Sequence, residues 1–100
     1  MKAVWNNTTV AEAPEDILIR IEGNWYFPPD AIKKEYFISN NHHTMCPWKG
    51  EASYYDVSVN GQTSESGAWY YPAPKASAVE RVRKDFGDYV AFWNGIEIIS

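Results

Sequence analysis

Residues 46–55 contain the densest group of side chains that could do chemistry. They include the only cysteine of the chain, a tryptophan, a lysine, a glycine and two adjacent tyrosines. A cysteine becomes a nucleophile when a neighbouring base or cation lowers its pKa, and His43 and Lys49 lie close to Cys46 in sequence. The alternative is a small buried residue before a proline turn, because free cysteines are commonly buried. Cys46 is therefore a candidate nucleophile, with His43 as its candidate partner.

The charged residues in and beyond this segment suggest contacts with a ligand rather than with a metal. Lys49 would contact an anionic group, and Gly50 would let a ligand approach the backbone closely; the alternative is an exposed lysine in a turn. Glu51 and Glu97 are candidates to orient Lys49 or to act as an acid or base. The adjacent pair His42-His43 predicts no metal site, because neighbouring side chains of an extended segment point to opposite sides.

Aromatic residues make up 16% of the chain and recur in three separate segments, which favours a β-rich core of large rings. Rings that converge would wall a pocket for a planar ring or a cation. Ordinary core packing is the alternative, since side-chain alternation buries about half of the rings in any case. Tyr54 and Tyr55 must face opposite sides of one strand. The candidate ligand-binding residues are Lys49, Gly50 and the aromatic residues Trp48, Tyr54, Trp69, Tyr71 and Trp93.

Length and charge exclude several classes of protein. One hundred residues predict a single domain, residues 1–100. The net charge of -4 opposes binding to the phosphate backbone of a nucleic acid. One cysteine excludes an internal disulfide and a zinc site of several thiolates, and we expect no cofactor. We expect no membrane span, no leader peptide, a cytoplasmic location, and a monomer or weak dimer.

The first half of the chain predicts short strands joined by polar turns. The expected strands are residues 4–5, 10–11, 17–22, 25–27 and 36–38. Gly23-Asn24 is the expected turn between the third and the fourth of them. Asp30 would cap a short helical turn over residues 31–35. The polar residues 39–44 predict an exposed loop.

The second half predicts further strands and two tight hairpin turns. The expected strands are residues 53–59, 68–71, 89–93 and 96–98. The dipeptides Asn60-Gly61 and Asn94-Gly95 favour the turn in which both central residues take a positive φ. The second of these turns predicts that residues 89–93 pair with residues 96–98. The polar residues 62–67 predict a mobile connection.

One helix is expected, from Ser77 to Phe86. Val79, Val82 and Phe86 recur at the spacing of a single buried helix face. Gly87 suits the left-handed position that follows a helix. The chain is therefore predicted to be a small, mainly β, antiparallel domain with one short α-helix.

Four segments resemble the signature blocks of a bacterial family, the domain of unknown function 427. They are residues 46–55 (CPWKGEASYY), 68–74 (AWYYPAP), 90–93 followed by 95–98, and 22–27 with Tyr36-Phe37. The resemblance spans nearly the whole chain in order and spacing. It implies a β-tent domain, in which two sheets meet at an angle. Some β-tent proteins hold zinc with four cysteines, a set that this chain lacks, and several bind small ligands between indole rings.

Members of this family are also labelled nucleotidyltransferase-like. Nucleotidyl transfer normally needs paired carboxylates that hold Mg²⁺ beside a phosphate-binding loop, and the sequence shows neither feature. The first hypothesis is therefore a small-molecule-binding domain, with Trp48, Tyr54, Trp69 and Trp93 around Lys49. The alternatives are an enzyme with Cys46 or Lys49 in its site, and a protein-interaction domain.

Overall fold

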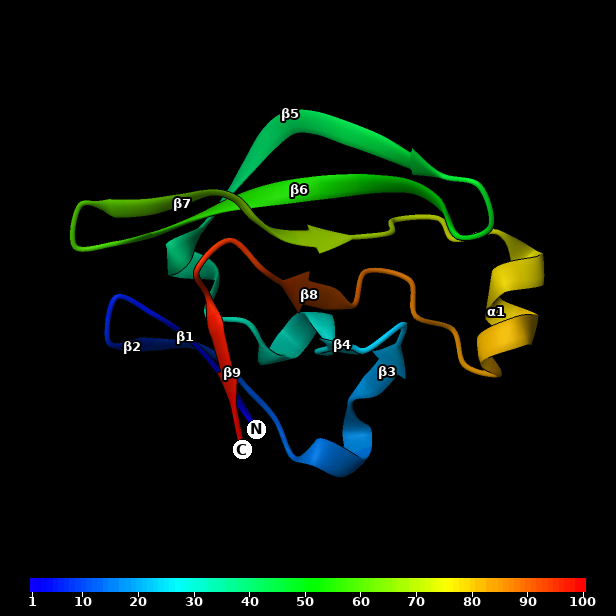
Figure 1. Cartoon of the computed structure of the whole chain (residues 1–100), viewed down its shortest axis with the longest axis horizontal. Coiled ribbons are helices and arrows are strands. Elements are labelled where there is room, and N and C mark those ends of the chain that lie inside the picture. The colour runs from blue at the N-terminus through cyan, green and yellow to red at the C-terminus, as the bar shows by residue number, and fades with distance from the viewer.

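The computed structural model describes residues 1–100, and its backbone is mainly β (Figure 1). The strands are β1 (Lys2–Trp5), β2 (Thr8–Glu12), β3 (Ile19–Ile21), β4 (Asn24–Tyr26), β5 (Phe37–Cys46), β6 (Gly50–Val59), β7 (Gln62–Tyr70), β8 (Val90–Phe92) and β9 (Glu97–Ile99). The one α-helix is α1 (Ala76–Val82), and three short 3-10 turns are η1 (Glu15–Ile17), η2 (Pro29–Ala31) and η3 (Lys34–Tyr36). The predicted fold class, a small β domain with one short helix, is confirmed. No helix is long and apolar enough to cross a membrane.

The strands form three antiparallel sheets, in the orders β2-β1-β9, β3-β4 and β5-β6-β7-β8. Phe27, which follows β4, exchanges two backbone hydrogen bonds with Val90 of β8, each with an N–O distance of 2.8 Å. The two-stranded sheet therefore continues the four-stranded one as a single layer, β5-β6-β7-β8-β4-β3. Figure 1 shows this layer descending from the arch of β5 to β3.

This layer has a separate hydrophobic core on each face, because side chains alternate along its strands. The larger core includes Phe27 and Val90, and it also contains residues of the β2-β1-β9 sheet. The smaller core includes their neighbours Tyr26 and Ala91. It also contains Ala78 of α1, so the helix covers this second face. As predicted, the adjacent rings of Tyr54 and Tyr55 pack against opposite cores, because side chains alternate along the strand.

Two polar stretches predicted as a loop and as a mobile connection, residues 39–44 and 62–67, are parts of β5 and β7. Asp56 of β6 explains the error. Its Oδ1 accepts a hydrogen bond from Asn40 Nδ2 at 2.7 Å and another from the Ser66 backbone N–H at 2.8 Å. The pairing of β6 with both neighbouring strands is irregular near this residue. The Asp56 carboxylate therefore bridges the two polar stretches on either side of β6.

The expected helix and the expected last hairpin are corrected. The helix ends at Val82, because Arg83 takes a left-handed φ of 67° and donates its backbone N–H to the Val79 carbonyl. The turn at Asn94-Gly95 exists, but the strands on either side of it do not pair. Strand β8 pairs with β7, and β9 pairs with β1 in another sheet. A tight turn reverses the direction of the chain, but it does not determine which strand the following segment pairs with.

Smaller corrections concern residues 15–36. The expected strand 17–22 is shorter, because residues 15–17 form η1 and only Ile19–Ile21 pair with β4. The turn lies at Glu22-Gly23, where φ is 53° and 82°, rather than at Gly23-Asn24. The helical turn expected over residues 31–35 is replaced by the separate turns η2 and η3.

Candidate functional site

The turn between β5 and β6 carries a buried lysine, Lys49. The segment before α1 holds this turn in place: the Lys75 backbone N–H donates to the Lys49 carbonyl at 2.9 Å, and Lys75 Nζ donates to the Pro47 carbonyl at 2.7 Å. Figure 1 shows α1 beside the β5–β6 connection. Gly50 has a φ of +116°, and an added Cβ would lie 3.5 Å from the Ala73 carbonyl oxygen. The backbone that approaches Gly50 closely is the chain's own.

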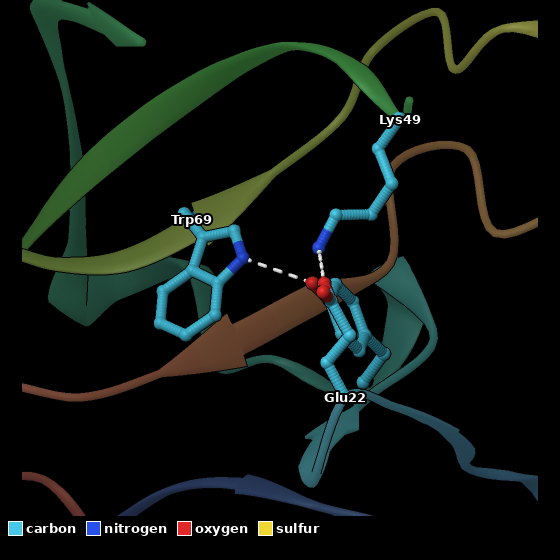
Figure 2. Close-up of polar contacts among 4 residues, drawn as sticks. Glu22, Lys49 and Trp69 are labelled. Atoms are coloured by element: carbon cyan, nitrogen blue, oxygen red, sulfur yellow. Dashed lines mark hydrogen bonds and ion pairs between the residues drawn. The ribbon is translucent and has the colours of Figure 1, made fainter. Parts of the chain in front are cut away.

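Lys49 is only 6% exposed, yet it is charged. Figure 2 shows its side chain reaching from the turn to the carboxylate of Glu22, with which it forms an ion pair. Its Nζ lies 5.3 Å from the ring centroids of both Trp48 and Tyr71. Burial lowers the pKa of Lys49, but the hydrogen bond to Glu22 opposes burial, and the balance raises the pKa above its ordinary value. Lys49 therefore stays cationic at neutral pH, whereas a nucleophilic lysine needs a lowered pKa.

Glu22 is the partner that sequence reasoning missed. The two acids expected near Lys49 lie elsewhere: Glu51 is exposed on β6, and Glu97 pairs with Val4 in the other layer. Glu22 is 27 residues from Lys49, in the β3–β4 turn. The one available signal was the family-like block of residues 22–27, which begins with this glutamate.

Most of the aromatic rings expected to meet do gather on the face that carries the smaller core. Tyr71 is buried in it, and Trp48, Tyr54 and Trp69 pack against it. Trp69 Nε1 donates a 3.0 Å hydrogen bond to the hydroxyl of the fully buried Tyr26. Burial raises the pKa of Tyr26 above its ordinary value, so this hydroxyl stays neutral.

Trp93 contacts this group of rings only at its solvent-exposed edge. Its ring lies edge-on to Trp69, with 6.2 Å between centroids, and it is 54% exposed. The rings on this face are packed against one another, and the structure places its one cavity elsewhere.

The expected nucleophile and its expected partner do not form a pair. Cys46 is half-buried and packs against the smaller core. His43 is three residues away on the same strand, and its Nδ1 lies 3.2 Å from Ser53 Oγ. The other histidine, His42, packs its ring against Tyr54 at 4.5 Å. No three His, Cys, Asp or Glu side chains are grouped as metal ligands would be.

An open depression of about 560 Å³ lies on the opposite face of the layer, and we call it the aromatic depression. Its walls include Tyr55 and Tyr70, whose rings stack with centroids 4.7 Å apart. Phe37 meets Tyr55 edge-on at 5.6 Å. The full lining is Pro29, Ile32, Lys34, Phe37, Tyr55, Tyr70, Pro72, Asp88 and Val90. None of the ligand-binding residues named from the sequence lines it, although their immediate neighbours Tyr55 and Tyr70 do.

Electrostatics keep the hydroxyl of Tyr55 protonated. Burial raises the pKa of Tyr55 to about 12, and Tyr70 adds to this effect. At neutral pH the hydroxyl is therefore a hydrogen-bond donor as well as an acceptor. Lys34 and Asp88 add one positive and one negative charge to the lining.

The model of the family described as Domain of unknown function (DUF427), with the short name NTP_transf_9, matches residues 1–99. The chain belongs to the DUF427 family. No curated protein matches it. In this DUF427 protein, the family-like block 46–55 supplies both the Lys49 turn and Tyr55 of the aromatic depression.

The Glu22–Lys49 ion pair makes the free energy of unfolding depend on pH. The hydrogen bond from Lys49 lowers the pKa of Glu22 below its ordinary value of 4.5. A carboxyl whose folded-state pKa is depressed stabilises the fold above its unfolded pKa, and this contribution is lost as pH falls through the folded pKa. At pH 7 we expect Glu22→Gln to lower the free energy of unfolding by about 1 kcal/mol, a small value because water screens the half-exposed carboxylate.

Urea denaturation at pH 7 and at pH 3 checks this expectation. The difference between the wild type and Glu22→Gln should be smaller at pH 3 than at pH 7, because a growing fraction of Glu22 is protonated as the pH falls. Glu51→Gln, which alters an exposed carboxylate away from Lys49, is the matched control and should change little at either pH. A Glu22→Gln difference of the same size at both pH values would contradict the ion-pair interpretation.

Proposed function

We propose that this DUF427 protein is a small-molecule-binding domain, and that the aromatic depression receives a planar, ring-containing ligand. The observation that carries the proposal is the cavity itself. Its volume of about 560 Å³ lies within the range of about 300–1,000 Å³ that ligand pockets occupy. Its lining combines aromatic and aliphatic side chains with a few polar groups, which is typical of such pockets.

The lining indicates the chemistry of the ligand. Phe37, Tyr55 and Tyr70 offer ring faces and edges against which a planar ring packs favourably. The Tyr55 hydroxyl offers a donor to a carbonyl or a ring nitrogen. Lys34 and Asp88 offer opposite charges, so a ligand with polar groups at both ends fits better than a hydrocarbon. A neutral or zwitterionic heterocycle matches all of these features.

The enzyme alternatives have less support. Lys49 is held as a cation, which does not suit an amine nucleophile. Cys46 has no histidine hydrogen-bonded to it, since His43 faces Ser53. Binding therefore explains more of the geometry than catalysis does.

A thermal-shift screen of planar heterocycles, followed by calorimetry on the best compound, tests the proposal. A ligand at 100 times its Kd should raise the free energy of unfolding by about 2.7 kcal/mol. Tyr55→Phe keeps the ring and removes the hydroxyl, so it should weaken binding about five- to tenfold. Tyr54→Phe removes the neighbouring hydroxyl on the opposite face, and it should leave the affinity unchanged.

Two results would overturn the proposal. One is a screen in which no heterocycle stabilises the protein. The other is a ligand whose affinity falls for Tyr54→Phe but not for Tyr55→Phe, because that ligand would bind on the other face of the layer.

A further inference from the structure

One of the four tight turns of this protein differs from the other three in its first residue. Four turns have two consecutive residues with positive φ, and in three of them the first residue is asparagine: Asn6 at 50°, Asn60 at 49° and Asn94 at 52°. In the fourth the residue is Glu22, at 53°. Asparagine tolerates this left-handed conformation, whereas glutamate does not favour it. Residues held in disfavoured conformations cluster at binding and catalytic sites.

The carboxylate of Glu22 lies among positively charged and hydrogen-bonding groups from two segments, the β5–β6 turn and α1. Lys49 pairs with it directly. Two cations lie close to the Trp48 ring: the Arg81 guanidinium is 4.5 Å from its centroid, and Lys49 Nζ is 5.3 Å from it. Lys49, Trp48 and Arg81 all favour the charged form of Glu22, with Lys49 the strongest. An oxyanion is therefore stable at this position.

Glu22 is suited to leave this position. Its side chain is 55% exposed, whereas that of Lys49 is 8% exposed. A counter-anion offsets part of the cost of burying the Lys49 charge. Glu22 can turn into water without losing hydration, so an incoming oxyanion would replace it with little electrostatic change at Lys49.

We propose that Lys49, Trp48 and Arg81 form an oxyanion-binding site, and that Glu22 occupies it as an exchangeable internal ligand. The phosphate or carboxylate group of a small molecule takes the place of the Glu22 carboxylate. This site lies on the opposite face of the layer from the aromatic depression, so the proposal does not rest on the function assigned to that depression. Glutamate rather than asparagine at the turn then reflects the binding site instead of the fold.

Titration with inorganic phosphate, followed by NMR of the Trp48 indole N–H, tests the exchange. Removing the internal carboxylate removes a competitor held at a high effective concentration. Glu22→Gln should therefore bind phosphate at least about tenfold more tightly than the wild type. Glu22→Asn should do the same, and it should be at least as stable as Glu22→Gln, because asparagine favours the turn. Glu51→Gln, the exposed-carboxylate control, should bind like the wild type.

The cationic side of the site is tested in the Glu22→Gln background. Adding Lys49→Met should abolish binding, and adding Arg81→Ala should weaken phosphate more than acetate, because the second cation matters most for the dianion. A preference for acetate that survives Arg81→Ala would identify carboxylates as the ligands. Equal phosphate affinity in the wild type, Glu22→Gln and Glu22→Asn would overturn the proposal, as would undiminished binding after Lys49→Met.

Discussion

Replacing Phe86 by alanine should lower the free energy of unfolding by about 3–5 kcal/mol, the typical loss for a fully buried phenylalanine. Phe86 is completely buried, although it lies beyond the end of α1. Its ring meets Tyr26 at 6.3 Å and Tyr71 at 5.9 Å between centroids. Because Tyr71 packs beside Lys49, this ring supports the smaller core beneath the Lys49 turn. Urea denaturation at pH 7 measures the effect.

Two exposed aliphatic residues provide the control for this prediction. Ile17 is 48% exposed and Ile99 is 44% exposed, so alanine at either position removes little buried area. Each change should stay within about 0.5 kcal/mol of the wild type. A loss at Phe86 no larger than the loss at Ile17 would show that the smaller core is not a main source of stability.

Replacing Gly50 by alanine should lower the free energy of unfolding by about 1–3 kcal/mol. The φ of +116° at Gly50 lies in a region that residues with a Cβ rarely adopt. The surrounding atoms are at ordinary contact distance, the nearest being the Ala73 carbonyl oxygen at 3.5 Å, so backbone strain rather than crowding causes the loss. The variant should also disturb Lys49, which is adjacent in the turn.

Gly61→Ala is the control that separates the loss of stability from the disturbance of Lys49. Gly61 has a φ of +80° in the β6–β7 turn and nothing within 4 Å of an added Cβ, far from Lys49 in sequence. It should cost about 1–2 kcal/mol and leave the Trp48 indole signal unchanged. If Gly50→Ala is as stable as the wild type, or if both variants shift the Trp48 signal equally, the role given to Gly50 is wrong.

Local patterns predicted what depends on neighbouring residues. Alternation placed Tyr54 and Tyr55 on opposite faces, and the Asn-Gly dipeptides marked the turns at Asn60 and Asn94. Burial on both faces of one layer also follows from adjacent aromatic residues within a strand, such as Tyr54-Tyr55 in β6 and Trp69-Tyr70 in β7. These features need only the period of a strand and the conformational range of asparagine and glycine.

Long-range contacts escaped the same reasoning. Pairing of β9 with β1 joins the two ends of the chain, and no local pattern specifies it. Asp56 bridges polar strands through side-chain contacts that composition does not show. The Glu22–Lys49 pair spans 27 residues.

The aromatic depression escaped prediction for the same physical reason. Its lining joins η2, η3 and the beginning of β5 to the far end of β7. A concave surface exists only once these segments pack, so the rings of Phe37, Tyr55 and Tyr70 carry no separate signal in the sequence. The family-like blocks include Tyr55 and Tyr70, which line the depression, but only the fold determines which of the two faces of the layer is hollow.

Two-dimensional amide NMR with the tightest-binding heterocycle is the most direct test of ligand binding in the aromatic depression. We expect saturable shift changes at the amides of Lys34, Phe37, Tyr55, Tyr70 and Asp88, which share no continuous segment of sequence and meet only in this cavity. Saturable changes confined to the Lys49 turn and α1, with the amides around Tyr55 and Tyr70 unmoved, would contradict the proposed function.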